Sequence, residues 1–182
     1  AMASQDVRYY LNGILLEVSP SQINVVATDG HRLAWSSCKI KTDFTDEKII
    51  IPRKSALELQ KLLNLYPENV NVAFNSNQLK VFSDEYTFIS KLIEGSYPDY
   101  EKVFPKGTEQ KLKANKSLVQ TALNRAAVLS NEKYRGVKFI LEKDNLKICA
   151  NNPSKESAEE EVLVEYSGDS FEIGFNISYV QE

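Results

Sequence analysis

The sequence predicts an α+β protein that contains two copies of one structural unit. Apolar residues alternate with polar residues over several short stretches, as in half-buried strands, and elsewhere they recur at helical spacing. One strand-turn-strand pattern also occurs twice along the chain. With 182 residues, 42% of them hydrophobic, the chain is long enough for one large domain or two small ones.

The repeat joins two segments, GILLEVSPSQINVVATDG from Gly13 and GVKFILEKDNLKICANNP from Gly136. When these glycines are superposed, the apolar residues coincide without a gap, and equivalent residues lie 123 positions apart. A chance match between common strand patterns is the alternative explanation. After a gap of one residue, IIIPRK falls on FEIGFN and places Ile51 on Ile173. The copies are therefore expected to be co-linear over about 40 residues.

Within the first copy, a helix and two more strands are expected after IIIP. Pro52 suits the first position of the helix. Ala56, Leu59 and Leu63 share one face of that helix. Two strands of alternating pattern follow, separated by NSN and then followed by EYTFISKLI. Their apolar residues are Val70, Val72 and Phe74 in the first strand, and Leu79 and Val81 in the second.

Another helix is expected before the second copy, in NKSLVQTALNRAAVLSNE, with Ser117 as its N-cap. Its apolar stripe consists of Leu118, Ala122, Ala126 and Leu129. The first copy has almost no room for an equivalent helix before Gln5, and the second copy stops at Glu182, where its next helix begins. The sequence is therefore interpreted as a fragment of a longer protein, truncated at both ends.

Three further segments have simple structural interpretations. Residues 96–110, with two prolines and one glycine, are interpreted as a linker. The run SKESAEEE, residues 154–161, is interpreted as a solvated acidic loop or as one half of a charged interface. Cys38 and Cys149 lie far apart in β-rich stretches and are interpreted as small buried residues rather than as a disulfide.

Composition and charge exclude several classes of function. A net charge of -3 argues against nucleic-acid binding by bulk positive charge, although it is compatible with a locally basic face. One histidine and no close cysteine pair leave too few nitrogen and sulfur ligands for a zinc site. No apolar run approaches the roughly 20 residues of a membrane helix, and the N-terminus has no signal-peptide pattern, so a cytoplasmic location is expected.

The segment ATDGHRLA, residues 27–34, contains the only histidine of the chain. In a strand, Asp29 and His31 would point the same way, so the carboxylate could orient the imidazole in a hydrolytic triad with a serine such as Ser36. Nothing marks that serine, because the sequence has no G-x-S-x-G elbow and no glycine-rich oxyanion loop. An enzyme is therefore not the favoured interpretation.

The same segment fits a tight turn between two strands, for which TDG is a typical sequence. One interpretation is a purely structural turn capped by Asp29. The other is the rim of a binding site, because Thr28, His31 and Arg32 place polar donors beside the apolar Leu33. Spacing alone leaves both interpretations open.

Two clusters could contact an anionic polymer. In QDVRYYLNG, Arg8 lies beside Tyr9 and Tyr10, a combination that can hold a nucleic-acid backbone or stack on bases. Ordinary packing in a core and at an edge explains the tyrosines equally well. Arg53 and Lys54 fall in the first turn of the expected helix, where the helix dipole disfavours cations by ~0.3 to 1 kcal/mol each. DNA phosphate would offset that cost, and solvated surface charge is the alternative.

Taken together, these motifs closely resemble the bacterial replicative sliding clamp, the beta subunit of DNA polymerase III. The resemblance covers essentially the whole chain, in the family's order and spacing. The segments that carry it are ASQDVRYYLNGILLE, ATDGHRLA, IIIPRKSALEL, SKLIEGSYPDYEKVFP, RAAVLSNEKYRGVKF, LKICANNP and YSGDSFEIGFNISYV.

The resemblance implies DNA-clamp (processivity-fold) domains. In that family, three similar domains are joined in one chain, and two chains close head to tail into a ring around duplex DNA. Helices line the hole and antiparallel sheets lie outside. Residues 1–106 are expected to form the second clamp domain without its first helix, and residues 107–182 the first half of the third. The implied function is that of a non-enzymatic processivity factor without cofactor or metal. A stand-alone peptide-binding adaptor that does not encircle DNA is the alternative.

The resemblance also implies three sets of site residues. A pocket for the clamp-binding peptides of the polymerase, the clamp loader and repair proteins is matched by Leu11, Thr28, Gly30, His31, Arg32, Leu33, Pro98, Lys102, Val103, Tyr134, Asn176 and Tyr179. The DNA-facing surface is matched by Gln5, Arg8, Tyr9, Tyr10, Arg53 and Lys54. The subunit interface of the dimer is matched by Val128, Leu129, Glu156, Glu159 and Glu160.

Overall fold

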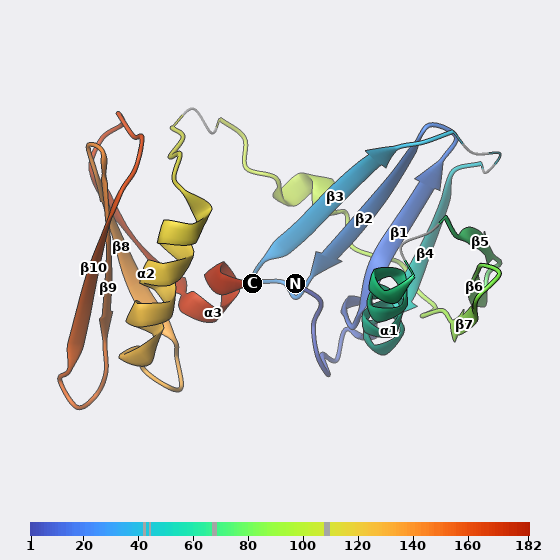
Figure 1. The fold of residues 1–182 in the computed structure, drawn as a ribbon, viewed down its shortest axis with the longest axis horizontal. Helices are drawn as coiled ribbons and strands as arrows, with labels where there is room; N and C mark the ends of the chain where they lie inside the picture. The colour runs from blue at the N-terminus through green and yellow to red at the C-terminus, as the bar shows by residue number, and fades with distance from the viewer. Residues whose placement is uncertain (42, 44, 67–68, 108–109) are drawn as a thin grey trace. The chain divides into compact units, whose positions relative to one another are not determined.

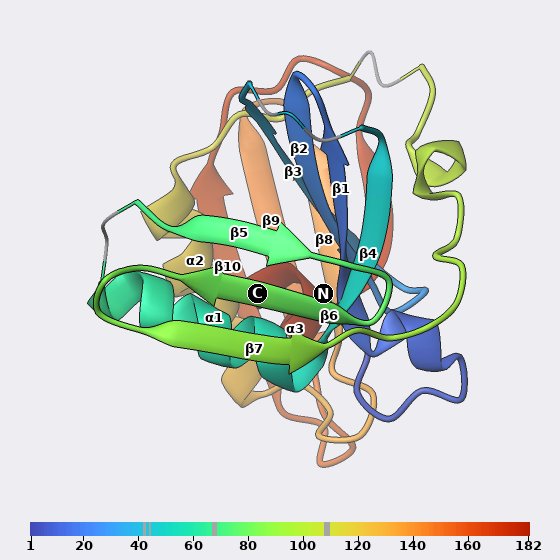
Figure 2. The same ribbon diagram turned by 90° about the vertical axis from the view of Figure 1, so that its right-hand side faces the viewer.

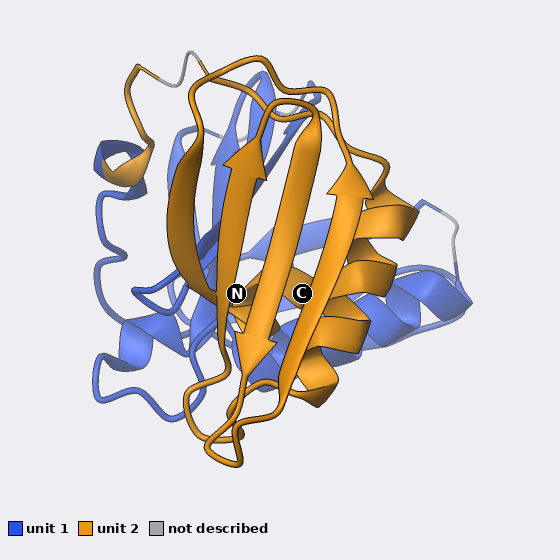
Figure 3. Ribbon diagram, turned by 90° about the vertical axis from the view of Figure 1, so that its left-hand side faces the viewer, with its two compact units in different colours: residues 1–102 blue, residues 103–182 orange. Residues whose placement is uncertain are grey.

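The computed structural model describes residues 1–41, 43, 45–66, 69–107 and 110–182. The chain divides into two compact units, residues 1–102 (unit 1) and residues 103–182 (unit 2) (Figure 3). This division falls a few residues before the domain boundary expected after residue 106. Part of the expected linker, residues 96–110, has regular structure, because Tyr100–Val103 form a 3-10 helix (η2) and Tyr100 is buried. Residues 108–109 of that linker lie outside the described residues.

Unit 1 begins with a short 3-10 helix, η1 (Tyr9–Leu11), and an antiparallel four-stranded sheet in the order β3-β2-β1-β4 (Figure 1). Its strands are β1 (Gly13–Ser19), β2 (Gln22–Thr28), β3 (Leu33–Lys39) and β4 (Glu47–Pro52). The expected strand-turn-strand pattern is therefore confirmed. The turn between β2 and β3, residues 28–33, projects from one end of this sheet.

The expected helix and strands of the first copy are also confirmed. They are α1 (Arg53–Leu65), β5 (Asn71–Phe74), β6 (Gln78–Phe82) and β7 (Thr87–Lys91). Figure 2 shows β5, β6 and β7 side by side next to α1. Ala56 and Leu59 of α1 pack against a core that contains Ile51 of β4 and Leu79 of β6. Pro52 precedes the first helical residue instead of occupying that position.

Unit 2 contains a second antiparallel sheet in the order β10-β9-β8-β11, with one helix across it (Figure 3). Its elements are α2 (Lys116–Val128), β8 (Gly136–Glu142), β9 (Asn145–Asn151), β10 (Ser157–Leu163), β11 (Phe171–Asn176) and α3 (Ile177–Gln181). The cross-strand pair Leu15–Val26 of unit 1 has its equivalent in Lys138–Cys149, 123 positions further along. The internal repeat is therefore structural.

The alignment of the last strand of the repeat was wrong by two residues. Ile173 pairs with Phe139, whereas the residue that pairs with the equivalent Leu16 is Ile49, not Ile51. A shift of two residues leaves every side chain on the same face of a strand, so the apolar pattern does not reveal it.

Three local expectations for unit 2 and the cysteines are corrected. The N-cap of α2 is Asn115, whose side chain accepts hydrogen bonds from the backbone of Ser117 and Leu118. Much of the expected acidic loop is the edge strand β10, whose glutamates face away from the core or pair with cations. Cys38 is exposed and Cys149 is only partly buried, because Cys38 lies on the edge strand β3 and Cys149 on the outer face of its sheet. Both thiols are free.

An apolar groove of about 720 Å³ lies on unit 1, between the β3-β2-β1-β4 sheet, α1 and the sheet of β5, β6 and β7. Val25 and Ile23 line this groove and are only partly buried. Their equivalents in unit 2, Ile148 and Leu146, are 0% and 4% exposed in the core beside α2. Within the described residues of unit 1, no helix covers the groove in the way that α2 covers the sheet of unit 2.

The exposed groove predicts that the chain self-associates, because contiguous apolar surface of this kind drives association. Sedimentation velocity at increasing concentration is expected to show a rising average mass, and Val25→Glu is expected to reduce this rise by placing a charge in the groove. A wild-type chain that stays a single monomeric species across the concentration range contradicts this prediction.

No helix among the described residues is long and apolar enough to cross a membrane.

Candidate peptide-binding site

The 28–33 turn is closed by its own polar groups. The Thr28 hydroxyl donates to the carbonyl of Arg32 at 2.7 Å and accepts from the backbone N–H of Gly30 at 3.1 Å. Gly30 has a φ of +87°, a conformation that favours glycine. His31 is exposed at the tip. The turn is thus a rigid loop that presents an imidazole to solvent.

Asp29 holds the turn from inside. One carboxylate oxygen accepts from the backbone N–H groups of His31 at 2.9 Å and Arg32 at 3.1 Å, and the other accepts from Arg32 Nε at 3.1 Å. Partial burial raises the pKa of Asp29, but these hydrogen bonds and the Arg32 charge outweigh burial and lower it below the usual value of 3.8. Both carboxylate oxygens are committed to the turn, which removes the geometric basis for a hydrolytic triad.

Two substitutions separate the charge of Asp29 from its hydrogen bonds. Asp29→Asn keeps one acceptor for the two backbone N–H groups and is expected to weaken peptide binding only about twofold, whereas Asp29→Ala is expected to weaken it roughly tenfold. Titrations with labelled peptide measure the affinities. Equal peptide affinities for Asp29→Asn and Asp29→Ala would contradict the role given to the hydrogen bonds of Asp29.

The same carboxylate makes the stability of the turn depend on pH. Because the pKa of Asp29 is lowered in the folded chain, the wild-type turn is fully stabilised above pH 3.8 and loses this contribution as the pH falls through the lower folded value.

The segment before β1 supports the turn from one side. Arg8 forms an ion pair with Asp6 at 2.8 Å, and its guanidinium donates to the carbonyl of Asp29 at 3.5 Å. The hydrogen bond from Arg8 lowers the pKa of Asp6 to about 2. A Cβ atom on Gly30 would lie 3.2 Å from this guanidinium. The role of Asp6 could not be predicted from the sequence, because nothing in its spacing links it to the turn.

Two apolar residues assigned to the pocket differ in exposure. Leu11, in η1, is 1% exposed and belongs to the interior. Leu33, the first residue of β3, is partly buried and packs against a core cluster that contains Leu15, Val26 and Tyr100. Leu33 therefore offers apolar surface to a ligand next to the polar turn, whereas Leu11 is buried and offers almost none.

The segment from Pro98 to η2 is anchored on β1. The Tyr100 hydroxyl donates to a carboxylate oxygen of Glu17 at 2.5 Å, and Lys48 pairs with the other oxygen at 2.6 Å. Burial, followed by the nearby Glu17, raises the pKa of Tyr100. Sequence reasoning did not find this anchor, which joins residues 83 positions apart.

The remaining predicted residues of this segment are exposed. Pro98 is exposed, and Lys102 pairs with Asp99 at 2.9 Å on the surface. Val103 ends η2 and is 64% exposed.

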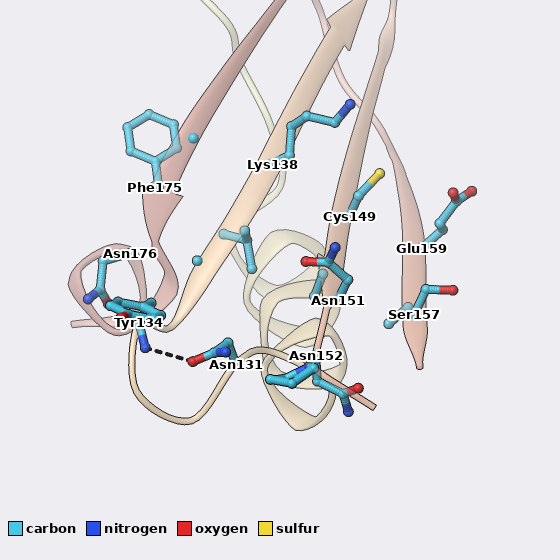
Figure 4. A pocket seen from close by; sticks show the side chains of 16 residues that line it. Asn131, Tyr134, Lys138, Cys149, Asn151, Asn152, Ser157, Glu159, Phe175 and Asn176 are labelled. Carbon is cyan, nitrogen blue, oxygen red and sulfur yellow. Dashed lines mark hydrogen bonds between the residues drawn. The ribbon is translucent and has the colours of Figure 1, made fainter. Parts of the chain in front are cut away.

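Besides Val103, three predicted pocket residues lie in unit 2. Tyr134 is 67% exposed, and its backbone N–H donates to the side chain of Asn131 at 2.9 Å. Asn176 caps α3 by accepting from the N–H of Ser178 at 3.0 Å. Tyr134 and Asn176 both line a pocket of about 930 Å³ at one end of the sheet (Figure 4). Tyr179, on α3, is not among the residues that line that pocket.

The expected DNA-facing residues differ in exposure and in their bonds to other parts of the chain. Gln5 and Lys54 are exposed, and Tyr9 is 57% exposed. Tyr10 packs against the same core cluster as Leu33, with its ring 5.8 Å from that of Tyr9. Arg53 lies in the first turn of α1, as expected, and donates to the carbonyl of Met2 at 3.1 Å. Arg8 is engaged with Asp6 and the turn, so internal bonds offset part of the positive charge of this set.

The expected interface residues lie at one end of α2, on β10 and, for Glu156, directly before β10. Val128 is 78% exposed. Leu129 follows it as the C-cap of α2. The three glutamates have partners within unit 2: Glu160 pairs with Arg125 at 3.2 Å, Glu159 with Lys147 at 3.4 Å, and Glu156 accepts from Asn152 at 2.5 Å.

No group of three or more histidine, cysteine, aspartate or glutamate side chains that could hold a metal ion is found in the part of the chain that the structure describes.

Comparison with known proteins identifies the family. The model of the DNA polymerase III beta subunit central domain matches residues 1–99, and the model of its C-terminal domain matches residues 101–182. The chain belongs to the family of DNA polymerase III beta subunits.

Individual relatives agree with this result. The Beta sliding clamp of Pseudomonas putida is 48% identical over 181 residues, and that of Escherichia coli K12 is 46% identical over 180 residues. Each match covers 99% of this chain and 49% of the relative. The chain therefore spans about half the length of the curated relatives it matches.

Solved structures show the same fold. A crystal structure of the DNA polymerase III subunit beta from Pseudomonas aeruginosa is similar with a TM-score of 0.95 and 47% identity, over 100% of this chain and 50% of that one. A sliding clamp from the same organism, bound to griselimycin, has a TM-score of 0.89 and 47% identity over 100% of this chain and 49% of that one.

Proposed function

We propose that the chain is part of a replicative sliding clamp, a non-catalytic processivity factor that tethers the replicative polymerase to DNA. Family membership and the clamp fold support this proposal. The observation that carries it is the 28–33 turn, which holds an exposed histidine beside the apolar surface of Leu33 on a rigid scaffold. Such a combination of apolar surface and fixed polar groups is typical of a peptide-binding site.

The proposed ligands are short peptides with about two apolar anchors, carried by the polymerase, the clamp loader and repair proteins. Each fully buried apolar side chain contributes ~1.5 to 3 kcal/mol, less the cost of ordering the peptide. Affinities in the micromolar range follow from these values. In unit 2, the proposal assigns peptide contact to Tyr134, Asn176 and Tyr179, which match peptide-binding positions of the family.

For DNA, we propose that the whole protein forms a ring of two chains joined head to tail. The Val128–Leu129 end of α2, together with Glu156, Glu159 and Glu160, would belong to the subunit interface. Encirclement retains the duplex by topology, so a net charge of -3 is compatible with a DNA partner. Tyr9 and Lys54, which are exposed, are the strongest candidates for direct DNA contact. This role places the protein in the cytoplasm.

A titration tests the peptide-binding part of the proposal. A fluorescent peptide of the Q-L-x-L-F type is titrated with the chain, and a peptide of the same composition in scrambled order is the control. Saturable binding of the first peptide alone is expected. If neither peptide binds, the proposal fails for this chain. Saturable peptide binding by this chain, together with failure of the full-length protein to remain on circular DNA, would favour the stand-alone adaptor.

A further inference from the structure

Tyr97 reaches the 28–33 turn from a distant part of the sequence. The pairing of β1 with β2 ends at Leu15–Val26, so Thr28, which still pairs with Leu33 of β3, lies beyond it. The backbone N–H of Thr28 donates instead to the Tyr97 hydroxyl, at 3.0 Å. This bond joins residues that are 69 positions apart. The tyrosine thus satisfies a polar backbone group that the pairing of β2 with β1 does not reach.

Thr28, held by Tyr97, is itself hydrogen-bonded to the rest of the turn. Its side chain bonds both the N–H of Gly30 and the carbonyl of Arg32. Holding the backbone of Thr28 therefore holds the position from which the exposed His31 projects. Tyr97 is also the residue before Pro98, so one side chain links the turn directly to the segment that carries Pro98.

The ring of Tyr97 is itself fixed. It is partly buried and packs against the core cluster of Leu15, Val26, Ile50 and Tyr100. Burial raises the pKa of Tyr97, against a smaller lowering by the hydrogen bond from Thr28, so the phenol stays neutral near pH 7. Because the ring is packed in place, its neutral hydroxyl is a fixed acceptor for the N–H of Thr28.

We propose that Tyr97 is a positioning residue for peptide binding: its hydroxyl sets the spacing between the 28–33 turn and Pro98. This inference rests on the proposed peptide-binding function. Tyr97 need not touch the peptide, because it acts through Thr28. Removal of the hydroxyl leaves the ring in place and the N–H of Thr28 without its acceptor, so the turn is free to shift.

The test is Tyr97→Phe, with Tyr86→Phe as a matched control. Tyr86 is in the same unit, and among the described residues its buried hydroxyl has no hydrogen-bond partner, so the control makes the same chemical change without losing a described bond. We expect Tyr97→Phe to weaken peptide binding about fivefold and to speed amide hydrogen exchange at Thr28 and Gly30. The control is expected to change neither quantity.

Global unfolding by urea, measured on both variants, distinguishes positioning from a general loss of stability. An unchanged peptide affinity in Tyr97→Phe, with wild-type binding intact, overturns the positioning role. Weaker binding with unchanged exchange at Thr28 overturns it as well. An absence of peptide binding by the wild-type chain is a failure of the proposed function instead, and in that case faster exchange at Thr28 alone would show only the structural bond.

Discussion

Replacing Leu33 with alanine is expected to weaken binding of a clamp-binding peptide at least tenfold. Leu33 is the partly buried apolar residue directly after the turn, so its side chain is positioned to contact an apolar anchor of the peptide. Loss of most of that contact removes about 1.5 kcal/mol, which corresponds to roughly a tenfold change in affinity. Fluorescence anisotropy with a labelled peptide measures the change.

Leu57→Ala is the matched control. Leu57 lies on α1 in the same unit and is 40% exposed. The same loss of side-chain volume at this position is expected to leave the affinity within twofold of wild type. Equal losses in the two variants would mean that Leu33 acts through general stability, and no loss in Leu33→Ala would contradict its place in the site.

The second large effect concerns stability. Leu11→Ala is expected to destabilise unit 1 by about 2 to 5 kcal/mol, the range for a leucine deleted from a packed core. Leu11 is 1% exposed, so the substitution removes packed side-chain atoms and leaves its backbone hydrogen bonds in place. Urea unfolding followed by tyrosine and tryptophan fluorescence measures the change.

A consequence follows for experiments on the pocket. Loss of peptide binding in Leu11→Ala would report disrupted packing, whereas loss in Leu33→Ala would report a contact. A destabilisation below about 0.5 kcal/mol in Leu11→Ala would contradict the burial of this residue, because changes of that size are typical of surface positions.

The strands and helices were predictable where the pattern is local. TDG predicted the turn, and alternation predicted β5 and β6, because both signals need only adjacent residues. The equivalence of the β1–β2 and β8–β9 pairs also followed from the repeat. The alignment of β11 did not, because a shift of two residues between Ile49 and Ile51 keeps the apolar face unchanged.

The N-cap of α2 and the exposure of Cys38 were harder to predict, because they do not depend on neighbouring residues alone. Asn115 and Ser117 are both good caps, and only the starting point of α2 decides between them. Cys38 looks like a core residue in a β-rich stretch, but β3 is an edge strand, and strand order is a property of the whole fold.

Only part of the candidate site could likewise be predicted from the sequence. Thr28, His31 and Arg32 were found because they adjoin a turn motif. The side chains that hold this turn in place, Arg8 and Tyr97, come from before β1 and from the segment after β7. Such contacts depend on tertiary structure, and a single sequence gives no signal for them.

Nuclear magnetic resonance on the isotope-labelled chain tests the central claim most directly. Unlabelled clamp-binding peptide is added stepwise, and the amide signals are followed. We predict saturable shifts that are largest in the 28–33 turn and in η2, with little change in β5 and β6. Saturable shifts confined to other surfaces, or no shifts at peptide concentrations well above the micromolar range, would contradict peptide binding at this site.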